Sequence, residues 1–327
     1  MTSFLLRWLA RLSPWMFIAS LAYAAMFIQL KADDSALDQP LLEKRDRFFG
    51  AAANNNALWF VGGDGVLLET GDGGQNWARQ KLPGAVNLQS TAVSPAGVRV
   101  VVGNQGKVFV GTVNSQSWKS YVLPLPDYAN KLNQVQFFDG AFWVVGEVGS
   151  VYRLSADGMT WKDYSLGDDF TINDIARAEN GALWLAGEYG NLFRSADNGN
   201  NWSRISLSEE TLRSIQFHAG EAVVVGNGGQ VYVSEDGGAN WYRQPPFTAE
   251  HLFDVTRHGD RWVAVGDQGQ VFAAPTATGE WTQTEPGGMS KSFFMSAVSV
   301  DSGIALAGKR PGLVDNNNRW VTWPEGE

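Results

Sequence analysis

One spacing recurs along most of the sequence and constrains the fold more than any other feature. A pattern Val/Ala-Gly-x-x-Gly, followed by a short apolar run and a tryptophan, occurs seven times, with a degenerate last copy. Successive tryptophans lie 41, 43, 41, 39, 40 and 39 residues apart, and in the first six copies the first glycine precedes the tryptophan by 15 residues. A register kept over so many copies indicates a repeated structural unit. The repeated tryptophans are Trp77, Trp118, Trp161, Trp202, Trp241, Trp281 and Trp320.

Each repeat predicts four short strands. In the fourth they are roughly INDIARA, ALWLAG, NLFRS and WSRISL, which are rich in β-branched and aromatic residues and bounded by Gly, Asn or Asp. Two residues between the paired glycines suit a tight hairpin between the second and third strands. Four antiparallel strands in about 40 residues, repeated seven times, predict an all-β, seven-bladed β-propeller over residues 46–327. An open solenoid is the alternative, but its units are usually shorter or helical.

An Asp-containing turn precedes several of the tryptophans. The motif Ser/Thr-x-Asp-x-Gly-x-x-Trp is complete in the first, fourth and fifth repeats and one residue shorter in the third. A carboxylate there can accept backbone N–H bonds, while the glycine adopts positive φ and the tryptophan packs between blades. We favour this structural role over calcium binding or catalysis, because the motif repeats with the fold. The residues concerned are Asp72, Trp77, Asp157, Trp161, Asp197, Trp202, Asp236 and Trp241.

The N-terminus predicts one transmembrane helix. Residues 13–30 carry no charge and are mostly apolar, and 18 residues of helix span roughly 27 Å, close to the thickness of a bilayer core. Arg7 and Arg11 would keep residues 1–12 in the cytoplasm. A signal peptide cleaved after Ala22-Tyr23-Ala24 is the alternative. Residues 31–45 are a polar linker, and small residues on the helix allow close packing against another helix. These small residues are Ala19, Ser20, Ala22, Ala24 and Ala25.

Composition excludes several classes of function. The net charge is −9 without a basic run, which argues against nucleic acid as a partner. The sequence has no cysteine, so disulfides, cysteine-ligated zinc and thiol nucleophiles are excluded. The three histidines, at positions 218, 251 and 258, do not have a metal-ligand spacing. We therefore expect no metal, no cofactor and no small-molecule substrate.

The repeats resemble a known family. The combination G-x-x-G-x-(V/L)-(Y/F)-R-S-x-D-x-G-x-x-W, closest in GEVGSVYRLSADGMTW and GEYGNLFRSADNGNNW, is similar to that of the photosystem II stability and assembly factor-like propellers. The Asp-containing turn resembles the Asp box of the bacterial neuraminidase repeat. The resemblance implies a polytopic membrane protein as partner: a reaction-centre protein bound through an arginine patch, or an exporter of the resistance–nodulation–division type that moves lipid or hydrophobic cargo. The strand arginine occurs only as Arg153 and Arg194, which puts an arginine ring in doubt.

The resemblance to the neuraminidase repeat raises an enzymatic alternative. A sialidase needs three arginines for the substrate carboxylate, a tyrosine nucleophile with a glutamate partner, and an aspartate. The first repeat lacks the Arg-Ile-Pro motif in which sialidases carry one of these arginines, and every repeat stays near minimal length, without insertions that would build a pocket. We predict that the protein is not an enzyme. A glycan-binding or sialidase-like glycoside hydrolase module stays the alternative.

The predicted partner surface is the face that carries the Gly-x-x-Gly turns. Residues between the paired glycines vary while the glycines persist, as expected of a recognition surface on a constant scaffold; ordinary polar hairpin tips are the competing interpretation. The protein would be a single-pass inner-membrane protein with its propeller in the periplasm, acting as an accessory, assembly or regulatory subunit. Candidate partner-binding residues are Glu147, Glu188, Tyr189, Asp267, Lys309, Arg310, Tyr128, Arg153 and Arg194.

Overall fold

The computed structural model describes residues 14–20, 23, 40–113, 117–289 and 291–324. The chain divides into two units, Met1–Pro40 and Leu41–Glu327. In the first unit, residues 14–20 are helical, and the Ser20 hydroxyl donates to the carbonyl of Phe17 at 2.8 Å. No helix in the described part of the chain is long and apolar enough to cross a membrane. Much of the predicted segment 13–30 lies outside the described residues, together with Ala22, Ala24 and Ala25.

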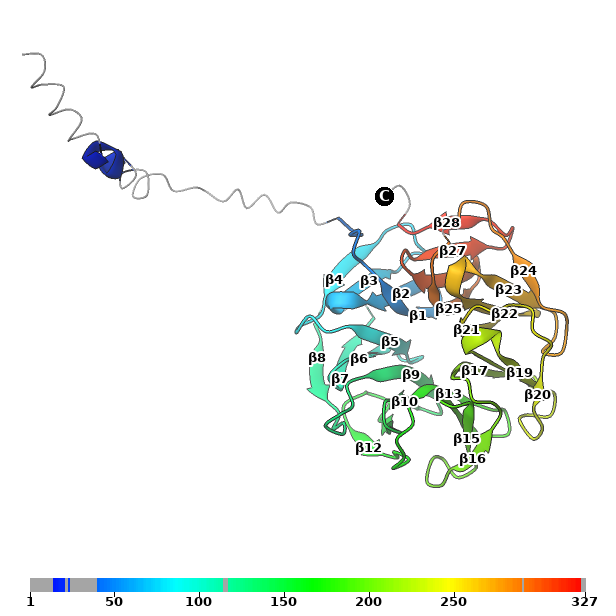
Figure 1. Cartoon of the computed structure of the whole chain (residues 1–327). Coiled ribbons are helices and arrows are strands. Elements are labelled where there is room, and N and C mark those ends of the chain that lie inside the picture. The colour runs from blue at the N-terminus through cyan, green and yellow to red at the C-terminus, as the bar shows by residue number, and fades with distance from the viewer. Residues whose placement is uncertain (1–13, 21–22, 24–39, 114–116, 290, 325–327) are drawn as a thin grey trace, which may run out of the picture. The chain divides into compact units, whose positions relative to one another are not determined.

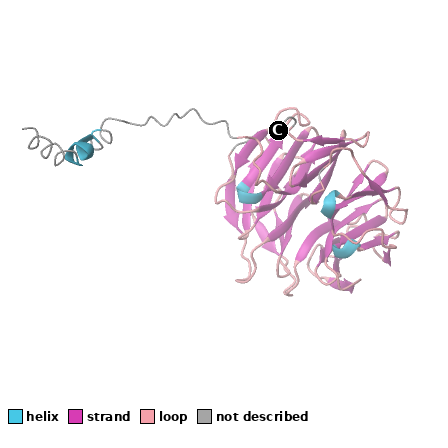
Figure 2. Cartoon of the chain, turned by 45° about the horizontal axis from the view of Figure 1, so that its top comes forward, coloured by secondary structure: helices cyan, strands magenta, loops and turns pink. Residues whose placement is uncertain are grey.

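The second unit consists of seven four-stranded antiparallel sheets arranged in a ring (Figure 1, Figure 2). The first four sheets contain β1 (Phe48–Asn54), β2 (Ala57–Gly62), β3 (Val66–Thr70) and β4 (Ala78–Lys81); β5 (Leu88–Val93), β6 (Val98–Gly103), β7 (Lys107–Thr112) and β8 (Lys119–Val122); β9 (Leu132–Phe138), β10 (Ala141–Gly146), β11 (Val151–Leu154) and β12 (Trp161–Asp163); β13 (Ile172–Arg177), β14 (Leu183–Gly187), β15 (Asn191–Ser195) and β16 (Ser203–Ser206). The last three contain β17 (Leu212–His218), β18 (Glu221–Gly226), β19 (Val231–Ser234) and β20 (Tyr242–Arg243); β21 (Leu252–His258), β22 (Arg261–Gly266), β23 (Val271–Ala274) and β24 (Thr282–Thr284); β25 (Phe294–Val300), β26 (Gly303–Gly308), β27 (Gly312–Asp315) and β28 (Trp320–Thr322). Three turns form short 3-10 helices, η1 (Gly63–Gly65), η2 (Asn227–Gly229) and η3 (Asp267–Gly269).

The predicted seven-bladed propeller is confirmed. Every sheet is built from four consecutive strands, and the first strand of each blade lines the central tunnel. The second strands are mostly apolar, as in AFWVVG of β10, because both of their faces are covered by neighbouring blades. The fourth strands form the outer rim, and WKD of β12 is exposed at all three positions.

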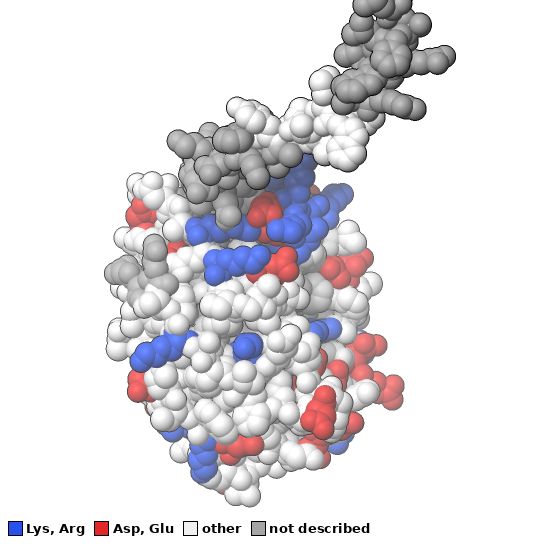
Figure 3. Space-filling model, turned by 90° about the vertical axis from the view of Figure 1, so that its left-hand side faces the viewer, with Lys and Arg blue, Asp and Glu red and all other residues white. Residues whose placement is uncertain are grey.

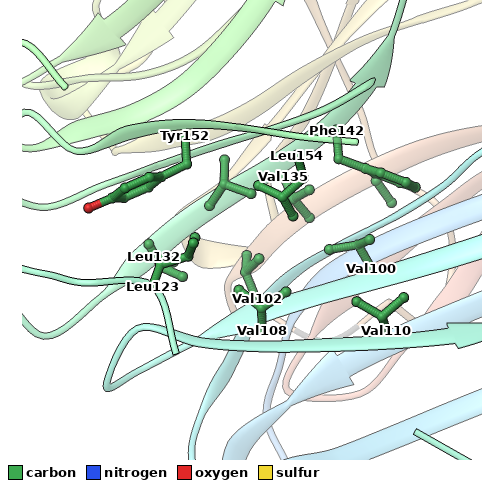
Figure 4. Packing of buried hydrophobic residues seen from close by; sticks show 12 residues of the cluster. Val100, Val102, Val108, Val110, Leu123, Leu132, Val135, Phe142, Tyr152 and Leu154 are labelled. Atoms are coloured by element: carbon green, nitrogen blue, oxygen red, sulfur yellow. The ribbon is translucent and has the colours of Figure 1, made fainter. Parts of the chain in front are cut away.

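The hydrophobic core lies between the blades. Between the second and third blades, Val100, Val102 and Val108 face Val135 and Phe142 (Figure 4). Six further clusters of buried apolar residues fill the other blade interfaces. Because each blade buries both faces against its neighbours, the repeat needs the closed ring to cover its apolar side chains.

Packing closes the ring, without exchange of a strand. The first and seventh blades share a cluster that includes Phe48, Phe60 and Trp323. The rings of Trp77 and Trp323 lie 5.5 Å apart between centroids. Each of the two blades is complete from its own consecutive strands, so the closing interface has the same construction as the others.

Candidate functional site

The Gly-x-x-Gly turns are held close to the backbone of the inter-blade links. A Cβ on Gly187, the first glycine of its pair, would lie 2.7 Å from the carbonyl oxygen of Thr171, and one on the second glycine of the first repeat, Gly65, would lie 2.7 Å from that of Leu82. Gly65 also has φ +76°. The amide of Leu82 donates to the carbonyl of Gly65 at 2.8 Å. The first glycine therefore allows close approach to the strand start, and the second allows the turn to bond the link into the same face.

Two bulky residues occupy strained positions at the tips of these turns. Val148 has φ +56° and Tyr189 has φ +54°, a left-handed conformation that costs side-chain-bearing residues free energy, most of all β-branched ones. They lie at equivalent positions in the neighbouring third and fourth blades. Tyr189 is 61% exposed and contacts Phe170 edge-on at 6.0 Å between ring centroids. The same left-handed conformation recurs at this position in other turns, at Asp64, Gln105, Gly228 and Gln268, so it is a property of the turn. The third and fourth blades differ in carrying bulky side chains there.

Replacing Val148 by glycine should stabilise the protein. Glycine adopts φ +56° without the steric cost that valine carries there, and Val148 is only partly buried. We expect the free energy of unfolding to rise by about 1 kcal/mol. Urea denaturation followed by tryptophan fluorescence measures this change. A destabilised variant would mean that valine contacts outweigh the backbone strain.

The carboxylates at two of the turn tips form hydrogen bonds within the protein. Glu147 Oε2 accepts the backbone N–H groups of Asn130 and Lys131 at 2.6 and 3.0 Å. Glu188 Oε2 accepts that of Thr171 at 2.9 Å. Each carboxylate thus anchors the link that enters its own blade, a role that the sequence-based interpretation missed. Lys309 and Arg310 are exposed and Asp267 is half-buried.

Of the other candidate residues, the two strand arginines lie apart from the turn tips, whereas Tyr128 lines a surface pocket together with the turn-tip residue Val148. Arg153 and Arg194 are on the third strands of their blades and extend over the indole rings of Trp143 and Trp184, 6.0 and 5.9 Å from the ring centroids. Each arginine is paired in register with that tryptophan on the second strand. Tyr128 lies in the link between the second and third blades and is largely exposed. The structure therefore places the two arginines in repeated cation–π contacts within separate blades.

The Asp-containing turns are closed by hydrogen bonds to the carboxylate. Asp197 accepts the side-chain amide of Asn201 at 2.7 Å, its backbone N–H at 2.9 Å, and the hydroxyl of Ser195 at 2.8 Å. These bonds lower the pKa of Asp197 to about 2, and equivalent bonds from Asn76 and Asn240 do the same for Asp72 and Asp236. The carboxylates are thus occupied within their own turns, and no group of three or more acidic or histidine side chains in the described residues could hold a metal ion.

The third blade has a shortened version of this turn. Asp157 accepts bonds from the Ser155 hydroxyl and the Met159 amide, which lower its pKa. The motif lacks the asparagine that binds the second carboxylate oxygen in the longer turns. Trp161 is 42% exposed and contacts Tyr152 edge-on, whereas Trp202 and Trp241 are partly buried against the interfaces of their blades. The expectation that the tryptophan packs between blades thus does not extend fully to Trp161.

The central tunnel contains a polar ring that sequence reasoning did not identify. The first strand of each blade has a β-bulge near its start. The residue after the bulge forms hydrogen bonds to the next blade at Ser90, Asp174, Ser214 and Asp254. The tunnel has a cavity volume of about 410 Å³. A small polar residue two positions after a buried Leu, Ile or Phe was the sequence signal that could have revealed it. Six of the seven equivalent positions carry the polar side chains of this polar ring, Ser90, Gln134, Asp174, Ser214, Asp254 and Ser296, and the seventh is Gly50.

Two buried carboxyl groups in the polar ring are joined by one hydroxyl. Ser214 Oγ lies 3.0 Å from Asp174 Oδ2 and 2.8 Å from Asp254 Oδ1. A hydroxyl has one hydrogen to donate, so both contacts are hydrogen bonds only when one carboxyl group is protonated. Burial raises the pKa of Asp174 to about 7 and that of Asp254 to about 6. The amides of Ile215 and Ala297 donate across to these carboxyl groups at 2.9 and 2.8 Å, so the triad connects four successive blades.

The fold and its turns define a class of protein, a seven-bladed β-propeller assembled from one repeat. We call the face that carries its Gly-x-x-Gly turns the turn face. Residues 114–291, more than half of the chain, match the family described as photosynthesis system II assembly factor YCF48, and the chain belongs to that family. A curated relative, the photosystem II assembly lipoprotein Ycf48 of Synechococcus sp. (strain CC9902), is 29% identical over 135 residues. That match covers 40% of this chain and 39% of the relative, so the chain spans well under half of the relative's length.

Solved structures agree with the fold. YCF48 bound to a D1 peptide has a TM-score of 0.65 at 18% identity and covers 80% of this chain and 90% of its own. A catalytically inactive virginiamycin B lyase from Staphylococcus aureus, solved with quinupristin, has a TM-score of 0.70 at 14% identity and covers 82% and 93%. At these identities the likeness concerns the architecture, which serves both an assembly factor and an enzyme.

Proposed function

We propose that this protein is a non-enzymatic, membrane-anchored, extracytoplasmic assembly or accessory factor whose turn face binds a polytopic membrane protein. The observation that carries the proposal is the turn face itself. Its glycines are required by the backbone of the turns, whereas the residues at the tips differ in chemistry and place two bulky side chains, Val148 and Tyr189, on neighbouring blades. Membership of an assembly-factor family supports the same reading.

Anchoring is proposed through residues 13–30. The segment is uncharged, follows two arginines and precedes a polar linker. The curated relative is named a lipoprotein. The present sequence has no cysteine to which a lipid could be attached. We therefore assign membrane attachment to the apolar segment, with the propeller on the periplasmic side.

The partner is proposed at the level of its class. One related structure is YCF48 bound to a D1 peptide, and the curated relative is a photosystem II assembly lipoprotein. These names support a membrane complex as the object of assembly. An exporter of the resistance–nodulation–division type was expected from the resemblance alone, and no comparison adds support for it.

The tunnel lining is the feature that bears on an enzymatic alternative. The lining supplies the carboxyl groups of Asp174 and Asp254 and the guanidinium of Arg177, which is paired with Asp139. Recognition of a carboxylated sugar would need several arginines free to form bidentate bonds. This lining therefore favours the binding function over a glycosidase.

A mild-detergent pull-down of the full-length protein from native membranes, followed by mass spectrometry, tests the proposal. We expect a polytopic membrane protein in fixed ratio, and we expect Tyr189→Ala to lower its recovery at least about tenfold, as for an exposed aromatic anchor. Recovery of the propeller alone, in the soluble fraction and cut after Ala24, would contradict the proposal.

Tyr242 offers a matched control for that experiment. It is 58% exposed, close to the 61% of Tyr189, but lies on the rim strand β20, away from the turn tips. Tyr242→Ala should leave recovery of the partner unchanged. Equal losses for the two variants would move the binding surface away from the turn face.

A further inference from the structure

Basic side chains gather where the linker joins the first blade, although the chain as a whole has a net charge of −9. We define the basic collar as Lys44, Arg45, Arg47 and Lys81. Lys44, Lys81 and Arg45 are exposed, the last at 69% of its side chain, and Arg47 is half-buried. On the side of the molecule that carries β4 and β8, Lys and Arg side chains are concentrated in the upper part of the view (Figure 3).

The collar is held on a rigid part of the propeller. Arg79 of β4 donates to the carbonyl of Leu41 at 2.9 Å and forms an ion pair with Asp46 at 2.6 Å. Leu41 and Leu42 pack against the cluster between the first and seventh blades. Lys81 is two residues from Arg79 on the same strand, so both side chains extend from the same strand face.

The charge of the collar is largely uncompensated. Among the four collar residues Arg45 is paired, with Glu43 at 2.8 Å. The other neighbouring carboxylate, Asp46, is engaged by Arg79, which lies outside the collar. Arg47 donates to the backbone carbonyls of Lys44 and Asp46, which carry no net charge. Within the described residues no ion pair involves Lys44, Arg47 or Lys81.

We propose that the basic collar binds the anionic phospholipid headgroups of the membrane in which the protein is anchored, and so holds the edge of the first blade against the bilayer. This inference rests on the anchoring in the proposed function. Leu41 follows the apolar segment 13–30 by 11 residues, and a chain of that length reaches at most about 39 Å. The collar is therefore kept within reach of the surface, at high effective concentration.

The expected strength is sufficient to orient the propeller. A basic residue near an anionic bilayer contributes about 1 kcal/mol, so the collar favours the docked orientation by roughly a hundredfold or more. The rim of the first blade would then face the lipid. The turn face would then be roughly perpendicular to the membrane plane, and it would be accessible to the extracytoplasmic loops of a neighbouring membrane protein. An acidic protein surface is the competing partner, but the position of the collar beside the linker favours lipid.

The absence of cysteine in the sequence allows a direct test with the full-length protein. A fluorophore is attached at Ala78→Cys, an exposed position on β4, and a second protein is labelled at Tyr242→Cys on β20. Both are reconstituted in phosphatidylcholine vesicles carrying a headgroup quencher, with or without about one third phosphatidylglycerol. We expect the anionic lipid to increase quenching at position 78 at least about twofold and to leave position 242 unchanged, with the increase abolished by about 0.5 M salt.

Charge reversal provides the matched comparison. Lys44→Glu/Arg45→Glu/Lys81→Glu should abolish the lipid-dependent quenching. Lys162→Glu/Arg243→Glu/Lys291→Glu changes the net charge equally at exposed positions elsewhere and should preserve it. Equal quenching in neutral and anionic vesicles, or equal effects of the two triple variants, would overturn the proposal and leave an acidic protein as the alternative partner.

Vesicle flotation separates this inference from the anchoring. Flotation with neutral vesicles reports insertion of the apolar segment. If the protein floats only with anionic vesicles, and salt releases it, the collar is supported and the anchor is wrong. If it floats with neither, both are wrong.

Discussion

Replacing Gly238 by alanine should lower the free energy of unfolding by about 3–4 kcal/mol. Gly238 belongs to the Asp-containing turn of the fifth blade and has φ +90°. A Cβ there would lie 2.5 Å from Cζ2 of Trp184, a fully buried residue of the fourth blade. The turn is thus pressed against the neighbouring blade, and neither the indole nor the backbone can move without opening the interface. Urea denaturation followed by tryptophan fluorescence measures the loss.

The adjacent glycine is the control for this prediction. Gly237 also has positive φ, +66°, but the nearest atom to its Cβ would be Asn180 Nδ2 at 3.6 Å. Gly237→Ala therefore introduces the backbone strain without the collision and should cost about 1 kcal/mol. If both variants lose the same stability, the contact with Trp184 does not hold the blades together. The same contact recurs where Gly199 meets Trp143 and where Gly74 meets Trp323 across the closing interface.

Stability should be highest near pH 4 to 5 and fall as the pH rises towards 7. The pKa values of Asp174 and Asp254 in the folded protein are about 7 and about 6, above the ordinary value of 3.8. Between pH 4 and 7 the folded state therefore holds protons that the unfolded state has released, and each unit of pH favours unfolding. We expect Tm to fall by about 5–10 °C between pH 5 and pH 8 and then to level off.

The acid side of the profile has a different origin. The pKa values of Asp72, Asp197 and Asp236 are lowered to about 2 by hydrogen bonds within their turns. Their stabilisation is complete above the unfolded value near 4 and is lost as the pH falls towards 2. Stability therefore decreases on both sides of the maximum, through two separate sets of carboxyl groups.

Two variants distinguish these sets by differential scanning fluorimetry over the pH range. Asp174→Asn should flatten the loss of Tm between pH 5 and pH 8, whatever its effect on Tm at pH 5. Asp197→Asn should change only the slope below pH 4. A profile for Asp174→Asn parallel to that of the wild type would show that the triad with Ser214 does not control the neutral side.

The sequence predicted the blades well, because the residues that specify each blade act on the conformation of their own strand or turn. The fourth blade was expected to contain ALWLAG and NLFRS; β15 has the expected bounds and β14 differs by one residue at its start. The glycine pairs were expected to mark hairpins, and they do, because positive φ and close backbone approach are properties of a few consecutive residues. The partner-binding roles of Glu147, Tyr189 and Lys309, and the transmembrane segment 13–30, stay predictions.

The sequence by itself determined the number of blades, their strands and the class of the fold, since period, alternation and turn chemistry are encoded within each 39- to 43-residue repeat. Only the tertiary structure decided which side chains of different repeats come into contact. Ser214 meets Asp174 and Asp254 at a separation of 40 residues on each side. Such contacts depend on the register of one blade against the next and on closure of the ring. Packing of complete blades sets both, and no single repeat specifies either.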